Sequence, residues 1–325
     1  MQKKSRSEEK VKFHLWIYNH SFTGVSDQIE FFVDFVRDNG IEVSIGNRPS
    51  ETCTNILIEN FQAVNVTPIY DYFSRTKKRV VVIMTEHIDF LDNVLYFHGA
   101  PIGSFSSEED YMHTTIQVDR LKTLIRISPL ISNFLTLGDL PLLNGLSEVF
   151  LGKPVVRIPF PTISDEVVSV GDITPKYDLA FSGAPTSYRL SILNELEKFG
   201  YSVNRNTSLK TRHRKNEFIQ SAKVILNLPQ HESWSWLSLM RIYTSLKQNR
   251  TTVSISTNDD SKISNSCTQL NIRSDGFNDI LKGIIENWTK NAFESQKLYN
   301  DLAETYKKET VNSFRSFLKF NELYR

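Results

Sequence analysis

The sequence has few cysteines and no long apolar run. Its two cysteines, Cys53 and Cys267, lie far apart, which fits neither a disulfide framework nor the ligand spacing of a zinc site. No stretch approaches the roughly 18 apolar residues of a membrane span, and residues 1–12 lack the apolar segment of a secretory signal. We therefore expect a cytoplasmic protein with reduced thiols and no metal.

Charge of one sign is also absent, because 38 Lys and Arg residues balance 37 Asp and Glu residues. This balance argues against nucleic acid as a partner, since such proteins carry a basic footprint. The short basic segment with Lys3, Lys4 and Arg6 leaves two interpretations open. It is either a solvated tail or a peripheral contact with the inner face of an anionic membrane.

Three phosphate-binding motifs are missing as well. The sequence has no Asp-x-Asp that would hold a metal-bridged diphosphate, no Gly-x-x-x-x-Gly-Lys-Ser/Thr loop, and no Gly-x-Gly-x-x-Gly after the first predicted strand. Kinase, P-loop and dinucleotide-binding functions therefore lack their defining parts. We expect no cofactor.

The chain is long enough for two domains. Its 325 residues exceed the roughly 250 to 300 residues that one hydrophobic core organises. Residues 161–175 contain two prolines, a glycine and several acidic residues without a clear period, so we place the linker there. We expect an N-terminal domain at residues 1–162 and a C-terminal domain at residues 163–325.

Both halves alternate predicted strands with predicted helices. In the first half, the strands are residues 13–18, 42–45, 55–59, 80–84 and 155–159; one helix runs from the N-cap Ser26 to Asn39, and residues 110–150 are mostly helical. In the second half, the strands are residues 177–181, 201–204, 224–228, 252–255 and 270–272; the helices are residues 187–199, 217–222, 237–246 and 277–319. This alternation predicts an α/β protein with two Rossmann-like domains, parallel sheets and C-terminal helices.

Ligands of such sheets bind at the carboxyl ends of the strands. In residues 222–256, a strand leads into a polar loop with His231 and Glu232 and then into a helix with Arg241. Glu232 could accept hydrogen bonds from sugar hydroxyls, while Arg241 and backbone N–H groups could hold a diphosphate. The segment therefore predicts a nucleotide-sugar donor site.

Two further segments add candidate donor contacts. After the strand at residues 177–181, Gly183 would let the backbone approach a phosphate, and Arg189 would face it. A basic cluster contains Lys210, Arg212 and Lys215, and it is either a solvated face or a contact that neutralises a diphosphate.

The two segments at residues 177–196 and 222–256 resemble the C-terminal domain of GT-B glycosyltransferases. In retaining members of that superfamily, two glutamates stand eight positions apart. Glu232 matches the first glutamate, but Met240 stands at the second position, next to Arg241. The chain is similar to divergent bacterial members, and the resemblance implies a GT-B fold with donor contacts at the residues above, leaving inversion or retention open.

The loop after the strand at residues 80–84 supplies the candidate catalytic residues. Glu86 and His87 emerge abruptly from an apolar run, and an inverting transfer needs a base that takes the proton of the acceptor hydroxyl. Glu86 is the first choice and His87 the second, with Glu59 a third candidate. Both residues could instead be a salt-bridged carboxylate and a hydrogen-bonded imidazole. His20 and Asp27, near the first strand, could also contribute or could cap a helix.

Together these features predict a metal-independent glycosyltransferase of polysaccharide biosynthesis. It would move a sugar from a UDP-, GDP- or CMP-linked donor to a glycan, a lipid-linked acceptor or another hydroxyl. An epimerase or hydrolase of nucleotide sugars with the same fold is one alternative. A non-catalytic binding protein that kept the fold is the other.

Overall fold

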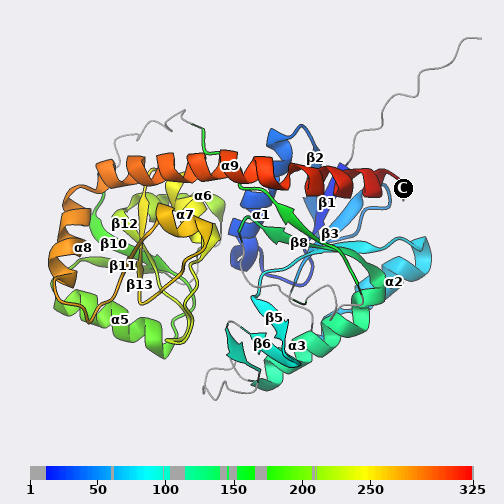
Figure 1. Cartoon of the computed structure of the whole chain (residues 1–325), viewed down its shortest axis with the longest axis horizontal. Helices are drawn as coiled ribbons and strands as arrows, with labels where there is room; N and C mark the ends of the chain where they lie inside the picture. Colours follow the sequence, from blue (N-terminus) through cyan, green and yellow to red (C-terminus); the bar gives the residue numbers. More distant parts are fainter. Residues whose placement is uncertain are drawn as a thin grey trace, which may run out of the picture.

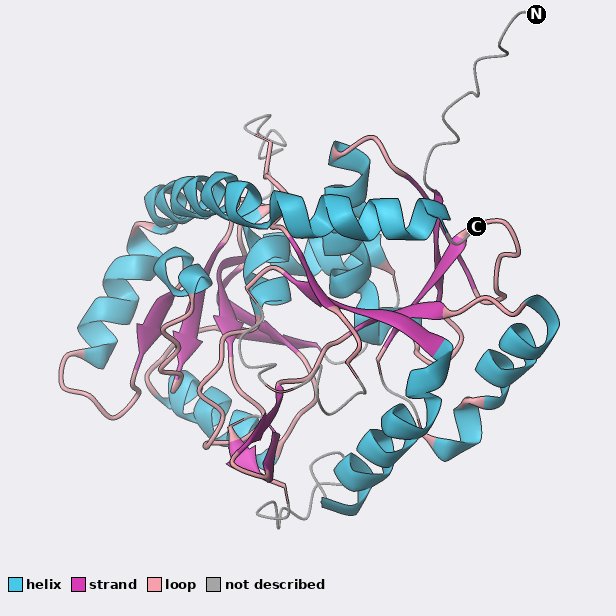
Figure 2. Cartoon of the chain, turned by 45° about the vertical axis from the view of Figure 1, so that its right-hand side comes forward, coloured by secondary structure: helices cyan, strands magenta, loops and turns pink. Residues whose placement is uncertain are grey.

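The computed structural model describes residues 12–59, 62–97, 99–102, 114–139, 152–164, 174–206 and 211–323, together with residues 145 and 209. Figure 1 shows two α/β lobes side by side, with one long helix lying across both. Figure 2 shows that the strands of each lobe are flanked by helices.

The first lobe contains a six-stranded sheet in the order β2-β1-β3-β4-β8-β9, in which every pair is parallel. Its strands are β1 (Lys12–Trp16), β2 (Glu42–Gly46), β3 (Thr54–Ile58), β4 (Val80–Ile83), β8 (Ile131–Leu137) and β9 (Val155–Ile158), and its helices are α1 (Phe22–Asp38), α2 (Thr67–Thr76) and α3 (Thr114–Ile127), with the short 3-10 helices η1 (Ala63–Asn65) and η3 (Ser128–Leu130). All four residues of β4 are buried, as expected for a parallel strand that is covered on both faces.

The prediction that residues 110–150 are mostly helical is wrong for β8. This strand is buried along most of its length and lies between β4 and β9. Its sequence, ISNFLTL, places Phe134 and Leu135 three and four positions after Ile131, a spacing that fits a buried helix as well as a buried strand. Pairing with β4, which is distant in sequence, decides between them.

A small antiparallel sheet stands apart from the main sheet of this lobe. It consists of β5 (Ile88–Leu91), β6 (Val94–Phe97) and β7 (Ala100–Pro101), and the sequence patterns did not predict it. The β5–β6 turn places Asp92 and Asn93 at φ of 50° and 63°, which matches the preferred two-residue hairpin turn.

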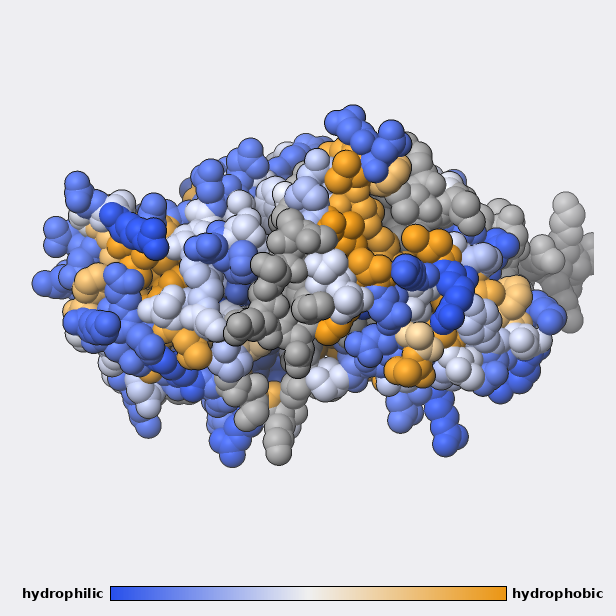
Figure 3. Space-filling model, turned by 90° about the horizontal axis from the view of Figure 1, so that it is seen from below, coloured by the Kyte–Doolittle hydropathy of each residue, from blue (hydrophilic) through white to orange (hydrophobic). Residues whose placement is uncertain are grey.

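Seen from below, the apolar residues on the surface of the molecule lie in separate patches among hydrophilic ones (Figure 3).

The second lobe contains a five-stranded parallel sheet in the order β11-β10-β12-β13-β14. Its strands are β10 (Tyr177–Ser182), β11 (Val203–Asn206), β12 (Ala222–Asn227), β13 (Thr251–Ile255) and β14 (Thr268–Leu270), and its helices are α5 (Ser187–Lys198), α6 (Arg212–Gln220), α7 (Leu239–Leu246) and α8 (Phe277–Glu286), with the 3-10 helix η4 (Lys262–Ser266). The predicted fold class, α/β with two Rossmann-like parallel sheets and C-terminal helices, is confirmed.

Two helices begin earlier than their sequence patterns predict. Helix α1 begins at Phe22 with Ser21 as its N-cap, so Ser26 is a buried residue within the helix and not its cap. Helix α6 begins at Arg212, because the Thr211 hydroxyl accepts a hydrogen bond from the backbone N–H of Arg214. Arg212 and Lys215 of the basic cluster thus lie in the first turn of a capped helix, and Lys210 lies outside the residues that the structure describes.

The last helix, α9 (Trp288–Leu323), joins the two lobes. At its start, the Arg250 guanidinium lies 4.4 Å from the centre of the Trp288 ring. Near its end, Phe314 packs edge-on against Phe35 of α1 at 4.9 Å between ring centres. One hydrophobic cluster includes residues of α1, α7 and α9, so the two lobes share part of their core. The boundary between residues 162 and 163 stays a prediction.

Candidate functional site

A cleft of about 1000 Å³ lies between the two lobes. On the first lobe it is lined by residues that follow β1, β3 and β4, and on the second lobe by residues that follow β10 and β12. Both sheets therefore present the carboxyl ends of their strands to one cavity, which is where doubly wound sheets bind ligands.

Arg241, in the first turn of α7, lies in the wall of the second lobe. Its Nη1 donates to Asn227 Oδ1 at 2.7 Å and its Nη2 donates to the Ser182 carbonyl at 3.1 Å. Burial lowers the pKa of Arg241 from its ordinary value, yet a guanidinium stays protonated in proteins. Both of these hydrogen-bond partners are neutral, and the carboxylate of Asp27 acts on the guanidinium through its charge without accepting either hydrogen bond. The Arg241 guanidinium can therefore still bind an anion in the cleft.

Two helices direct their N-termini at the same wall. Thr186 and Ser238, the N-caps of α5 and α7, both line the cleft. A helix N-terminus carries a partial positive charge and backbone N–H groups without partners inside the helix. The wall of the second lobe can therefore stabilise negative charge at Arg241 and at both helix ends.

Gly183 lies in the turn that follows β10, and it also lines the cleft. A Cβ at this position would lie 3.0 Å from Cζ of Phe181 and 3.4 Å from Nη1 of Arg189. The guanidinium groups of Arg189 and Arg241 lie 5.2 Å and 5.5 Å from the centre of the Phe181 ring. Because Gly183 has no side chain, the turn can pack closely against the Phe181 ring and the Arg189 guanidinium.

Arg189 also lines the cleft, and backbone carbonyls hold its guanidinium. Its Nε and Nη2 donate to the Leu228 carbonyl at 3.0 and 2.9 Å, and its Nη1 donates to the Ala184 carbonyl at 3.1 Å. With only 6% of its surface exposed, it ties the loop after β10 to the loop after β12. Arg189 therefore helps to fix the shape of this wall, and a contact between its side chain and a donor stays a prediction.

The wall of the first lobe contains two buried carboxylates that share one arginine. Arg120 Nη2, from α3, donates to Glu59 Oε2 at 2.7 Å and to Glu86 Oε1 at 2.9 Å. The Thr85 hydroxyl also donates to Glu59 Oε2, at 3.2 Å. Glu59, Glu86 and Arg120 are each at most 7% exposed, and all three line the cleft.

Burial and the neighbouring Glu86 raise the pKa of Glu59, despite the opposing effect of Arg120. One guanidinium cannot neutralise two carboxylates, so the pair retains a proton more readily than isolated glutamates do. The folded chain thus binds this proton more tightly than the unfolded chain.

The pH dependence of stability tests this shift. As pH rises above 4.5, the ordinary pKa of Glu59, the wild type should lose stability relative to Glu59→Gln, because the raised pKa opposes folding once the carboxyl ionises. Urea unfolding of both proteins between pH 4 and pH 8 measures the difference. A difference that stays constant over this range would contradict the raised pKa.

His20, in the loop after β1, faces the same cleft. Its Nε2 lies 3.2 Å from the Ile58 carbonyl and 3.0 Å from the Glu59 carbonyl. Carbonyl oxygens only accept, so Nε2 carries the proton and Nδ1 carries the lone pair in the neutral ring. Burial lowers the pKa of His20, which favours this neutral form, an imidazole that can accept a proton.

Two tryptophans of the second lobe reach across to the first lobe. Trp234 is buried in a hydrophobic cluster with Trp16 and other residues of the first lobe. Trp236 stacks on His87 with 5.4 Å between ring centres and 4° between ring planes. Trp236 also lies 3.5 Å from the Cβ position of Gly99, next to β7. The loop after β12 is thereby anchored on both sides of the cleft.

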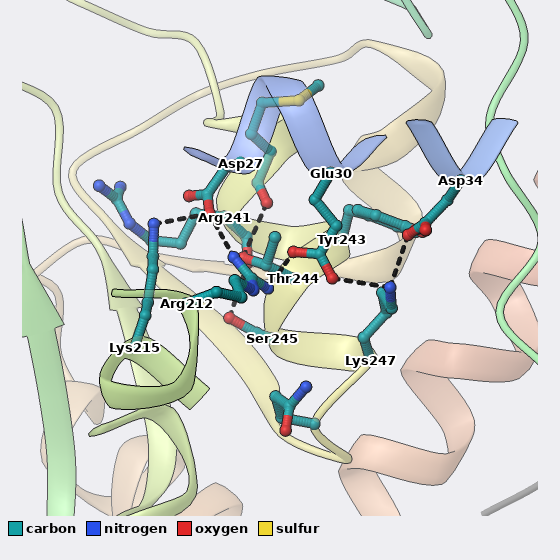
Figure 4. A network of polar contacts seen from close by, with 12 residues as sticks. Asp27, Glu30, Asp34, Arg212, Lys215, Arg241, Tyr243, Thr244, Ser245 and Lys247 are labelled. Atoms are coloured by element: carbon teal, nitrogen blue, oxygen red, sulfur yellow. Dashed lines mark hydrogen bonds and ion pairs between the residues drawn. The ribbon is translucent and has the colours of Figure 1, made fainter. Parts of the chain in front are cut away.

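A polar network holds the lobes together beside the cleft (Figure 4). Three acidic residues, Asp27, Glu30 and Asp34, lie on one face of α1, where spacings of three and four residues place them together. Lys247, at the end of α7, donates to Glu30 and Asp34 at 2.7 and 2.5 Å. Tyr243 donates its hydroxyl to Asp34 at 2.6 Å.

The same network engages Arg212, which was predicted to bind the donor. Arg212 pairs with Asp27 at 3.0 Å and with Glu30, and it is not among the residues that line the cleft. The carboxylates of α1 thus pair with its charge, and a contact between Arg212 and a donor stays a prediction. Lys215 does line the cleft, where its Nζ pairs with Asp27 at 2.6 Å.

His231 and Glu232 also lie outside the cleft. Glu232 is exposed in the turn after β12, and His231 Nδ1 lies 2.8 Å from the Ser233 hydroxyl. The position of both residues gives the predicted donor contact no support, and replacing Glu232 tests it. The chain turns outward at this point before Trp234 returns to the core.

The substitution Glu232→Ala should therefore have little effect on nucleotide affinity or on stability. We expect nucleotide affinity to stay within about twofold and the free energy of unfolding within about 0.5 kcal/mol, as for other exposed positions. Calorimetric titration and urea unfolding measure the two quantities. A loss of affinity of tenfold or more would instead restore Glu232 to the site.

Sequence reasoning missed Arg120 and Asn227 as site residues. Arg120 stands on the buried face of α3 beside Gln117 and Thr123, and polar side chains on a helix face that packs against a sheet are an available signal. Asn227 is the last residue of the apolar strand β12, and Glu59 comes directly after β3. Each is a polar residue at the carboxyl end of a strand.

Within the part of the chain that the structure describes, no group of three or more His, Cys, Asp or Glu side chains is arranged to hold a metal ion. None of the described helices is both long enough and apolar enough to cross a bilayer.

No protein-family model matches the chain, and no curated protein matches it. Solved structures do match. The glycosyltransferase AviGT4, involved in avilamycin A biosynthesis, has a TM-score of 0.47 at 12% identity, over 95% of this chain and 98% of that one. BGT of T4 phage, solved with UDP-glucose, has a TM-score of 0.46 at 8% identity, over 96% and 98%. TarM has a TM-score of 0.41 at 10% identity; 83% of this chain is covered but only 55% of TarM. Matches this distant do not decide the function of this chain, which has to rest on its own residues.

Proposed function

We propose that this chain is a glycosyltransferase that moves a sugar from a nucleoside-diphosphate sugar to a hydroxyl group of an acceptor. The observation that carries the proposal is the pairing of two opposite walls in one cleft. One wall offers Arg241 and two helix N-termini to an anion. The other offers a neutral imidazole and two carboxyls.

The donor would bind with its diphosphate against Arg241 and the N-termini of α5 and α7. These groups are fixed before a ligand arrives, so they can stabilise the charge that develops on the leaving diphosphate without reorganisation. They supply the role that a bridging cation has in metal-dependent transferases, which supports transfer without a metal.

The acceptor hydroxyl would lie against the wall of the first lobe. Glu86 and His87 remain candidates for the base; Arg120 donates a hydrogen bond to Glu86, and His87 is stacked on Trp236. His20 is the best placed of the three, because its neutral Nδ1 carries a lone pair. We assign it the proton transfer, with Glu86 within electrostatic range of its ring.

Calorimetric titration with UDP, GDP and CMP, followed by release assays with the matching sugar donors, tests the proposal. We expect binding of at least one nucleoside diphosphate and slow release of it from its sugar donor, accelerated by a glycan or lipid-linked acceptor. If no nucleotide and no nucleotide sugar binds, the proposal is wrong.

A further inference from the structure

Asn227, the last residue of β12, is a polar side chain buried in the wall of the donor cleft. Only 1% of its surface is exposed, and both ends of its amide are used. Its Oδ1 accepts from Arg241 Nη1 at 2.7 Å, and its Nδ2 donates to the Ser254 hydroxyl at 2.8 Å.

Chemistry fixes the orientation of this amide. A guanidinium has only donors, so the atom that faces Arg241 has to be the carbonyl oxygen of Asn227. The NH₂ group then faces Ser254 Oγ, which has lone pairs to accept its proton. Turning the amide by 180° would place donors against donors at Arg241, so a single orientation is stable.

Ser254 is itself held by a chain of hydrogen bonds from the next strands. Thr257 Oγ1 lies 2.7 Å from Ser254 Oγ and 2.8 Å from Gln269 Oε1. Gln269 is tied to the backbone of Asp259, whose N–H lies 2.8 Å from Oε1 and whose carbonyl lies 2.7 Å from Nε2. The chain therefore runs from β14 through β13 to the guanidinium in the cleft.

We propose that Asn227 is a positioning residue that orients Arg241 for a diphosphate without placing a carboxylate in hydrogen-bond contact with it. The inference rests on the proposed function of the cleft. Its basis is the contrast with Lys215 and Arg212, the neighbouring cations, whose partners are carboxylates of α1. The side-chain acceptor of Arg241 is a neutral amide, whereas the acceptors of Lys215 and Arg212 are carboxylates.

The substitution Asn227→Asp separates charge from shape. The two side chains have the same size, and the new carboxylate keeps an acceptor toward Arg241. On its other side, the Ser254 hydroxyl can turn and donate, because a hydroxyl serves in both roles. The variant therefore keeps one hydrogen bond at each end of the side chain, in exchange for the bond that Ser254 Oγ donates to the Asn227 backbone carbonyl at 3.2 Å. It also adds an ion pair that competes with a bound anion.

The experiment is calorimetric titration of wild type and Asn227→Asp with pyrophosphate, UDP and GDP, and with uridine and guanosine as probes without phosphate. We expect the dissociation constants of the diphosphates to rise about 10- to 100-fold, the range of a lost charge-assisted contact. The affinity for nucleosides should stay within about twofold, and the thermal midpoint should not fall. A merely structural role would weaken nucleosides and diphosphates alike.

Asn204→Asp is the matched control. Asn204 lies on the neighbouring strand β11 and also donates its amide to a serine hydroxyl, that of Ser221, at 2.9 Å, but it does not line the cleft. It adds the same charge without touching Arg241, so diphosphate affinity should stay within about threefold of wild type.

If Asn227→Asp does not fold, Ser254→Ala replaces it. This variant removes the acceptor that holds the amide, and diphosphate affinity should fall several-fold with nucleoside affinity unchanged. Equal diphosphate affinity in wild type and in the variant tested would overturn the inference. If wild type binds none of the diphosphates, the proposed function fails instead, so the two failures are distinguishable.

Discussion

Arg241→Ala is expected to weaken the binding of UDP or GDP about 100-fold. Arg241 is a cation in the wall of the second lobe whose two hydrogen-bond partners are both neutral, and hydrogen bonds between charged groups contribute about 1.5–3 kcal/mol each. Even at the lower end of this range, two such contacts to a diphosphate account for about two orders of magnitude in affinity. Calorimetric titration measures the loss.

Arg205→Ala is the control for this experiment. Arg205 lies on β11, pairs with Glu197 at 2.7 Å, and does not line the cleft, so affinity should stay within about twofold. Arg241→Lys should recover only part of the affinity, because an ammonium cannot form the two parallel hydrogen bonds of a guanidinium. Undiminished binding by Arg241→Ala would show that the anion site lies elsewhere.

Arg120→Met is expected to destabilise the fold by about 3–5 kcal/mol at neutral pH, the range for removing one partner of a buried ion pair. Its loss leaves Glu59 and Glu86 buried next to each other without the shared cation. Methionine keeps much of the volume, so the effect comes from charge and not from a cavity. Urea unfolding at pH 7 measures it.

Two further variants test whether the loss of stability comes from the buried carboxylates. Arg126→Met changes an exposed arginine of the same helix and should cost less than about 0.5 kcal/mol. Adding Glu59→Gln to Arg120→Met should restore part of the stability, because it removes one of the two unpaired charges. If Arg120→Met is as stable as Arg126→Met, the carboxyls do not depend on Arg120.

The fold could be read largely from the sequence, because its strands are short apolar runs separated by turn residues. The run VVVI of β4 and the strand that precedes Gly183 are examples, and both lie in parallel sheets. The strand β8 was missed, since Phe134 and Leu135 follow Ile131 at spacings of three and four, which also fit a helix.

The site was predicted less completely, for reasons of distance along the chain. Arg241 was found because it stands at the start of a helix after a strand, a local pattern. Arg120 meets Glu59 and Glu86 across 61 and 34 positions, and no local spacing encodes such a contact. Glu232 was misplaced because a loop's sequence does not tell which of its residues turn inward, and here Trp234 does.

The most direct test is a crystal structure of this protein with UDP or GDP bound. We predict that the nucleotide occupies the cleft between the lobes, with phosphate oxygens within hydrogen-bond distance of the Arg241 guanidinium and of backbone N–H groups at the start of α7. A nucleotide bound outside this cleft, or one whose phosphates lie away from Arg241, would contradict the account.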